Sequence, residues 1–151
     1  MWVAVAAVIG LVSASAGSAA ARVASANPKG VTSTEINVAG LVSKTVFGAS
    51  LQGAQARFDR ENAKGGVFGR KIKMVDVADD KFDPTTNVQE TRRVVSAGNV
   101  FAMVPTVTVT LGSGDYLAQQ KVPFFGWGIS AGFCGNQYGY GFTGCVAPKT
   151  P

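Results

Sequence analysis

The sequence predicts an α/β fold in which a Rossmann-like parallel sheet carries helices on both faces. Apolar, β-branched runs alternate with stretches of helical periodicity from residue 35 to residue 127. The hydrophobic fraction of 46% is sufficient for a sizeable core, and the charged fraction of 15% is too low for a disordered chain. A length of 151 residues fits one domain.

The first half of the chain predicts two strands around one helix. Residues 35–42 (EINVAGLV) are apolar and typical of a buried strand, and the polar residues 43–49 are expected to form a loop. Apolar residues recur at helical spacing over 50–64, and Gly65 ends this helix because glycine tolerates the left-handed C-cap. The alternating residues 70–77 (RKIKMVDV) predict the second strand.

The second half repeats the alternation. Asp83 is a predicted N-cap followed by proline at the first helical position, so a helix begins there and ends before Gly98. Residues 100–104 (VFAMV) predict a third strand, residues 112–120 a short helix, and residues 122–127 (VPFFGW) a fourth strand. Strands that alternate with helices indicate a parallel sheet, whose ligands lie beyond the carboxyl ends of the strands.

The first 21 residues resemble a secretory signal peptide. The apolar run 2–12 is followed by small residues and by an A-x-A cleavage site at 19–21, which leaves 22–30 as a linker. No basic residue precedes the apolar run, and an uncleaved anchor or a buried helix is the alternative interpretation. We therefore expect an exported protein of the periplasm or the cell surface.

Composition excludes several kinds of chemistry. The chain has no histidine, which rules out Ser-His-Asp and Cys-His catalysis and histidine-ligated metals. Neither a phosphate loop nor a GxGxxG motif follows the first strand, so we predict no catalytic residue, no metal and no cofactor. The 14 basic residues are scattered, and the formal net charge of +5 does not predict a nucleic-acid partner.

Only two cysteines are present, Cys134 and Cys145, on either side of a Gly-rich, aromatic loop. In an exported chain such a pair is expected to form a disulfide. A free reactive thiol is the alternative.

Two polar segments follow predicted strands. The hydroxyls of Thr106, Thr108 and Thr110 alternate along the chain, which suits either the binding of a carboxylate or other anion, or an edge strand. Asp79 and Asp80 suit either the binding of a ribose, an ammonium group or a cation, or a turn before the next helix.

Five segments stand out as motifs: GVTSTEINV at 30–38, ENAKGGVFGRKI at 61–72, DDKFDP at 79–84, VFAMV at 100–104, and VPFFGWG at 122–128 followed by FCG at 133–135. Together they resemble the branched-chain-amino-acid type of solute-binding protein of ABC importers, and the last resembles its actinobacterial branch.

This resemblance implies a type I periplasmic-binding fold, in which two lobes close on an amino acid, an amide, urea or a related solute. It implies a non-enzymatic receptor whose partners are a small-molecule solute and the membrane permease of the ABC transporter. The ligand contacts that it implies come from the loops after the first, third and fourth strands: Thr45, Thr106, Thr108, Thr110, Trp127, Gly128 and Ser130.

The resemblance covers part of the family's length, so we expect an N-terminal fragment. Residues 31–130 would form part of lobe one, and residues 131–151 would hold the disulfide loop and the start of the crossover to lobe two. Such an incomplete sheet is expected to expose apolar surface. The ligand-binding sensor domain of a signalling receptor with the same fold is the alternative function, and a small exported hydrolase is a third.

Overall fold

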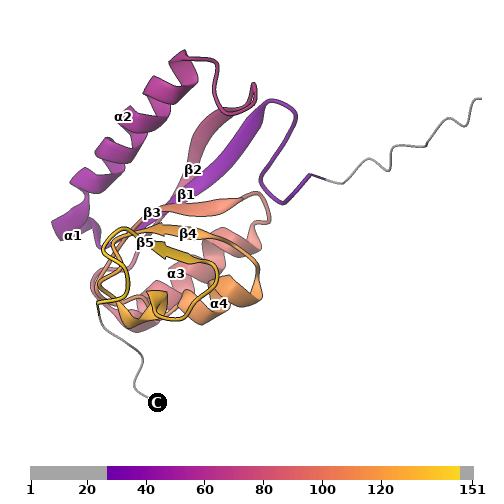
Figure 1. Ribbon diagram of the computed structural model, residues 1–151. Coiled ribbons are helices and arrows are strands. Elements are labelled where there is room, and N and C mark those ends of the chain that lie inside the picture. The colour runs from indigo at the N-terminus through magenta and orange to yellow at the C-terminus, as the bar shows by residue number, and fades with distance from the viewer. Residues whose placement is uncertain (1–26, 147–151) are drawn as a thin grey trace, which may run out of the picture.

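The computed structural model describes residues 27–146, which form a parallel five-stranded sheet between helices (Figure 1). The strand order is β2-β1-β3-β4-β5, and all four pairings are parallel. The strands are β1 (Glu35–Val42), β2 (Lys71–Asp79), β3 (Ala102–Val107), β4 (Phe124–Gly126) and β5 (Gly139–Gly141). The helices are α1 (Lys44–Phe47), α2 (Ala49–Ala63), α3 (Pro84–Ser96), α4 (Gly114–Gln119) and the 3-10 turn η1 (Ala131–Phe133).

The predicted fold class is confirmed, with corrections to two boundaries. Residues 43–49 are not simply a loop, because they contain α1 and the start of α2. The third strand is displaced from 100–104 to 102–107, so Thr106 lies inside a strand. That strand is central, between β1 and β4, so of the two interpretations of the threonine run the edge strand is excluded.

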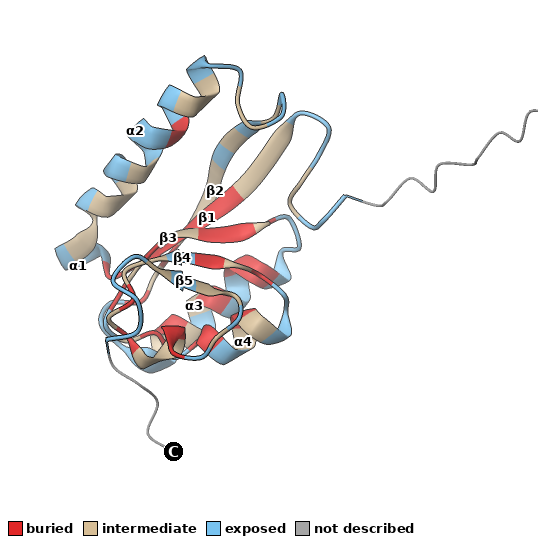
Figure 2. Cartoon of the chain, in the orientation of Figure 1, coloured by how far each residue is buried: buried red, intermediate tan, exposed pale blue. Residues whose placement is uncertain are grey.

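The two faces of the sheet are covered unequally (Figure 2). On one face, α3 and α4 contribute Val94, Val95 and Leu117 to a cluster that also contains Met103 and Phe124. On the other face α2 lies across β2, β1 and β3, and Phe58 is its only buried residue. No helix among residues 27–146 covers β4 and β5 on the α2 face (Figure 1).

The strand β5 is an addition that the sequence pattern did not predict. Phe124 N donates to Tyr138 O (2.9 Å), and Phe142 N donates to Gly126 O (2.9 Å). These bonds attach the loop of residues 134–145, here called the cysteine loop, to β4. Cys134 and Cys145 are joined within this loop, with their Cα atoms 5.0 Å apart.

We expect the denatured, unreduced protein to show no free thiol in a thiol titration. Reduction of the native protein should lower the free energy of unfolding by about 2–3 kcal/mol, because it reopens a short loop in the unfolded chain. The control is the reduced, denatured sample, which should titrate both cysteines. Two free thiols before reduction would refute the pairing.

Residues 1–26 and 147–151 lie outside the described part of the chain, and so do the predicted signal peptide and most of the linker. Within residues 27–146, no helix has the length and apolarity needed to cross a bilayer.

Candidate functional site

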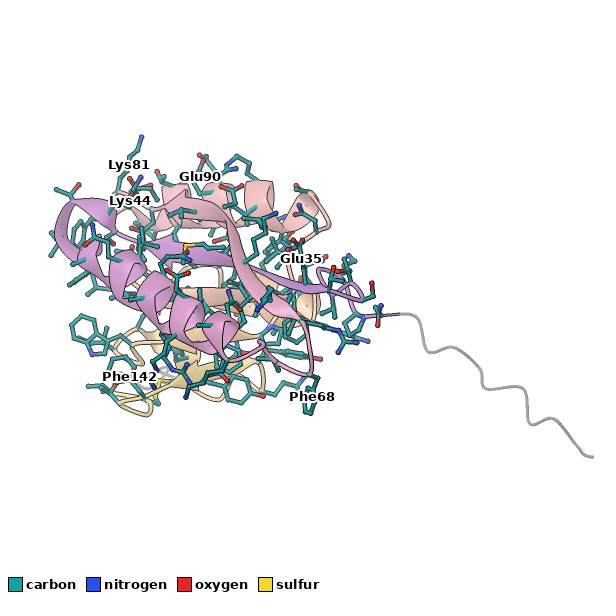
Figure 3. The ribbon with its side chains drawn as sticks, turned by 90° about the horizontal axis from the view of Figure 1, so that it is seen from above. Glu35, Lys44, Phe68, Lys81, Glu90 and Phe142 are labelled. Carbon is teal, nitrogen blue, oxygen red and sulfur yellow. A yellow bond between two sulfur atoms is a disulfide. The ribbon has the colours of Figure 1, made fainter. Side chains whose placement is uncertain are left out.

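The parallel strands all end at one edge of the sheet, where the loops after β1, β2, β3 and β4 come together. Figure 3 views the molecule from above and places Lys44, which follows β1, beside Lys81, which follows β2. The backbone N–H groups of both residues donate to Asp79 Oδ1, at 3.1 and 3.2 Å. This carboxyl edge is the candidate functional site.

At the centre of the edge lies Asp80, whose side chain is fully buried. Ser43 Oγ donates to Asp80 Oδ1 at 2.5 Å, and Phe82 N donates to the same oxygen at 3.1 Å. Asp80 Oδ2 accepts from three further side chains: Thr108, Thr110 (3.1 Å) and Asn87 (3.1 Å). One carboxylate therefore connects the loops after β1, β2 and β3 to α3.

Asn87 extends this connection to the helix that follows β3. Its Oδ1 accepts from both the backbone N and the hydroxyl of Ser113, at 3.1 and 2.8 Å. Ser113 Oγ also accepts from Thr91 Oγ1 at 3.0 Å. Asn87, Thr91 and Ser113 are all buried, so the network continues through the core rather than over the surface.

The ionised form of Asp80 is favoured by this network. Burial alone raises the pKa of a carboxyl group, but hydrogen bonds from Ser43, Thr108 and Asn87 outweigh burial and lower the pKa of Asp80 below its ordinary value. The neutral side chains of Ser43, Thr108 and Asn87 thus donate to a negatively charged carboxylate. Of the two interpretations of the Asp79-Asp80 pair, this geometry favours the structural turn, because both aspartates accept from protein donors.

The threonine hydroxyls are engaged inside the protein. Thr106 Oγ1 donates to Met103 O (3.2 Å) within its own strand, and the Thr108 and Thr110 hydroxyls both donate to Asp80. Ser130 is also engaged, since its Oγ accepts from Leu111 N at 3.2 Å. These four side chains therefore have hydrogen-bond partners within the protein.

The remaining predicted contacts differ in exposure. Thr45 is exposed on α1, and Trp127 is half-buried directly after β4. Gly128 is buried against the cysteine loop, and a Cβ atom there would lie 1.8 Å from Gly144 O. Trp127 N donates to Thr106 O at 3.0 Å, which fixes the start of this loop.

Three aromatic rings, from the segments that follow β1, β2 and β4, meet at the same edge. Phe47 of α1 lies 5.9 Å from Phe82 and 5.5 Å from Trp127, measured between ring centroids, and its contact with Trp127 is edge-to-face. Phe47 and Phe82 were not among the predicted site residues. The sequence DDKFDP could have indicated Phe82, because it is an apolar residue within an otherwise polar turn.

An open apolar groove of about 750 Å³ runs from this aromatic cluster over the uncovered face of β3, β4 and β5. Phe125 and Tyr140 stack within it, with centroids 4.8 Å apart. The expected apolar surface is therefore present. The groove is lined by Ser50, Ala54, Pro105, Val107, Phe125, Gly126, Trp127, Tyr140, Gly141 and Phe142.

A parallel sheet whose carboxyl edge gathers loops around an ordered polar network is typical of solute-binding lobes. The chain belongs to the periplasmic binding protein family, whose family model matches residues 35–148. Among curated relatives, the Leu/Ile/Val-binding protein BraC3 of Rhizobium johnstonii is 35% identical over 71 residues, which is 46% of this chain and 19% of that protein.

Two solved structures share the fold. A fatty acid ABC transporter substrate-binding protein from Thermomonospora curvata matches with a TM-score of 0.62 and 22% identity, over 74% of this chain and 30% of that one. The branched-chain amino acid transporter substrate-binding protein LivJ from Streptococcus pneumoniae, in complex with isoleucine, matches with a TM-score of 0.61 and 23% identity, over 70% of this chain and 33% of that one. The chain thus spans between a fifth and a third of the length of these proteins.

Proposed function

We propose that this chain supplies one lobe of the exported solute receptor of an ABC importer. Residues 31–130 would belong to the first lobe, and residues 131–151 would lead toward the second. The observation that carries the proposal is the family match over residues 35–148, together with a carboxyl edge whose loops are tied by Asp80. Hinge closure of a second lobe over this edge would trap the solute and present a closed form to a membrane permease.

The ligand that this edge favours is a small solute with an apolar part, such as an amino acid or an amide. Because the hydroxyls of Thr108 and Thr110 donate to Asp80, Trp127 and Phe82 offer side-chain surface near the edge. Thr45 is the exposed hydroxyl of the set. An indole face contributes apolar contact together with a single N–H donor.

The test is a thermal-shift screen of the intact exported protein against leucine, isoleucine, valine, acetamide, urea and small organic acids. A receptor should be stabilised by at least one of these solutes without turning it over. Turnover of a bound solute, or no stabilisation by any of them, would overturn the proposal.

We expect Trp127→Ala to weaken the affinity for a stabilising solute about tenfold, because an aromatic wall of the binding edge is removed. The control is Tyr116→Ala in α4, whose ring instead packs under the guanidinium of Arg92, at 4.4 Å from the ring centroid. Isothermal calorimetry of both variants compares the two losses. Equal affinities for Trp127→Ala and the parent would remove Trp127 from the site.

A further inference from the structure

At the opposite end of the sheet, a rigid turn carries one fully projecting aromatic side chain. The turn connects α2 to β2 and is here named the Phe68 turn (residues 65–70). Val67 and Arg70 exchange two backbone hydrogen bonds, of 2.8 and 3.0 Å, which close it. Arg70 Nε also donates to Thr32 O at 2.8 Å, so the turn is fastened to the segment before β1.

The Phe68 side chain contributes little to the core of the described fold. Phe68 is 93% exposed, so its ring packs against little of the protein. Its backbone has φ of 51°, in the left-handed region, where a bulky side chain is disfavoured. Figure 3 shows the ring directed away from the ribbon, at the end of the molecule remote from Lys44 and Lys81. An exposed ring held in a costly backbone conformation points to an external contact.

Four cations lie close to Phe68 in the chain. Arg60 and Lys64 are at the end of α2, Arg70 precedes β2, and Lys71, whose Nζ donates to Asn62 O, begins it. None of these four belongs to an ion pair within residues 27–146.

The nearby carboxylates already have partners. Glu61 lies 2.7 Å from Arg57, and Glu35 lies 3.6 Å from Lys73. Glu61 also attracts Arg60 and Lys64, and Arg57 together with these two cations lowers its pKa. Because one carboxylate faces three cations there, and Arg70 and Lys71 add two more, the charge near Phe68 remains positive and would attract an anionic surface.

The Phe68 turn and its neighbouring cations form a small surface, and its size indicates which kind of partner it can bind. A protein partner needs roughly 800 Å² of complementary surface on each side, with several packed apolar residues. The Phe68 turn offers one large exposed apolar side chain, with lysines and arginines in and next to the turn. A lipid bilayer requires less contact area, because one aromatic ring can enter its interfacial region while nearby cations interact with anionic headgroups.

We propose that the Phe68 turn is a contact site for an anionic lipid bilayer. The Phe68 ring would enter the headgroup region, and Arg60, Lys64, Arg70 and Lys71 would lie over anionic phosphates. Such a contact holds the amino end of the sheet against a membrane and leaves the carboxyl edge free for a solute. It is independent of the proposed receptor function, because neither Phe68 nor its cations belong to the candidate site.

The proposal is tested by sedimentation of the exported protein with vesicles of phosphatidylcholine, alone or with an equal part of phosphatidylglycerol. The parent should bind the anionic vesicles and should be released by about 1 M salt. Phe68→Ser should lower the partition coefficient about tenfold, since the apolar contact is lost. The double substitution Arg60→Gln with Lys64→Gln should lower it about tenfold or more.

Matched controls come from the other end of the molecule. Phe142→Ser removes a ring that is 77% exposed, and Lys44→Gln with Lys81→Gln removes two exposed cations. Both controls should leave vesicle binding unchanged. Equal losses in the controls, unchanged binding of Phe68→Ser, or equal binding to neutral vesicles would overturn the proposal. A photo-crosslinking residue at position 68 that attaches to a protein rather than to lipid in cells would also overturn it.

Discussion

Substitution of Asp80 by alanine is expected to lower the free energy of unfolding by about 3–5 kcal/mol. The carboxylate is fully buried and accepts from Ser43, Thr108, Thr110, Asn87 and the backbone of Phe82. Its removal leaves several buried donors without an acceptor. Each buried donor that finds no new partner costs about 1–3 kcal/mol. Urea denaturation followed by far-UV circular dichroism gives the change.

The adjacent carboxylate provides the control for this prediction. Asp79 is half-buried and accepts only from the backbone N–H groups of Lys44 and Lys81 among the contacts described above. Because both donors lie on exposed residues that water can reach, Asp79→Ala should cost about 1 kcal/mol. If the two alanine variants lose equal stability, Asp80 does not hold the edge together.

The same network predicts how stability depends on pH. The pKa of Asp80 is lower in the folded protein than in the unfolded chain, so its contribution is complete above the unfolded value of about 3.9 and is lost as the pH falls through the folded value. Asp80→Asn removes this titration, so its stability should fall less steeply than that of the parent below about pH 4. Asp76 and Asp83, whose pKa values are also lowered, titrate in both proteins.

The elements that the sequence predicts well are those with a complete local signal. The helix from Pro84 is one example, since Asp83 Oδ1 accepts from Thr86 N at 2.6 Å, as the N-cap pattern requires. The apolar run 35–42 is another, because a strand buried on both faces shows as a continuous apolar segment. In both cases residues close in the chain determine the local structure.

Short elements were missed because tertiary contacts determine them. The strand β5 consists of Gly139, Tyr140 and Gly141, and glycine is depleted in strands, so only pairing with β4 makes it extended. The helix α1 is a single turn, too short to produce a periodic pattern.

The role of the threonines was not predictable from their spacing alone. Thr108 follows Asp80 by 28 residues, and Ser43 precedes it by 37, so no local pattern connects them. The crossovers of a parallel sheet bring the ends of β1, β2 and β3 together, and only then is one carboxylate surrounded by hydroxyls. In the folded chain, the hydroxyls of Thr108 and Thr110 donate to Asp80, and so they help to order the loops of the edge.

Substitution of Gly126 by alanine is the second change from which we expect a large effect. A Cβ atom at this position would lie 1.9 Å from Thr106 O and 2.8 Å from Thr106 N, and both are backbone atoms of β3 that cannot rotate away. Strand β4 would have to separate from β3, which breaks the 3.0 Å hydrogen bond from Trp127 N to Thr106 O and displaces Trp127 from the edge. We expect the free energy of unfolding, measured by urea denaturation, to fall by about 3 kcal/mol or more.

The control is Gly53→Ala in α2, where a Cβ atom meets nothing within 4 Å. The higher helix propensity of alanine should raise the free energy of unfolding by about 0.5–1 kcal/mol. If Gly126→Ala lowers the free energy of unfolding and Gly53→Ala raises it, the loss at position 126 comes from the close approach of β3 and β4. A change of the same sign in both variants would contradict this account.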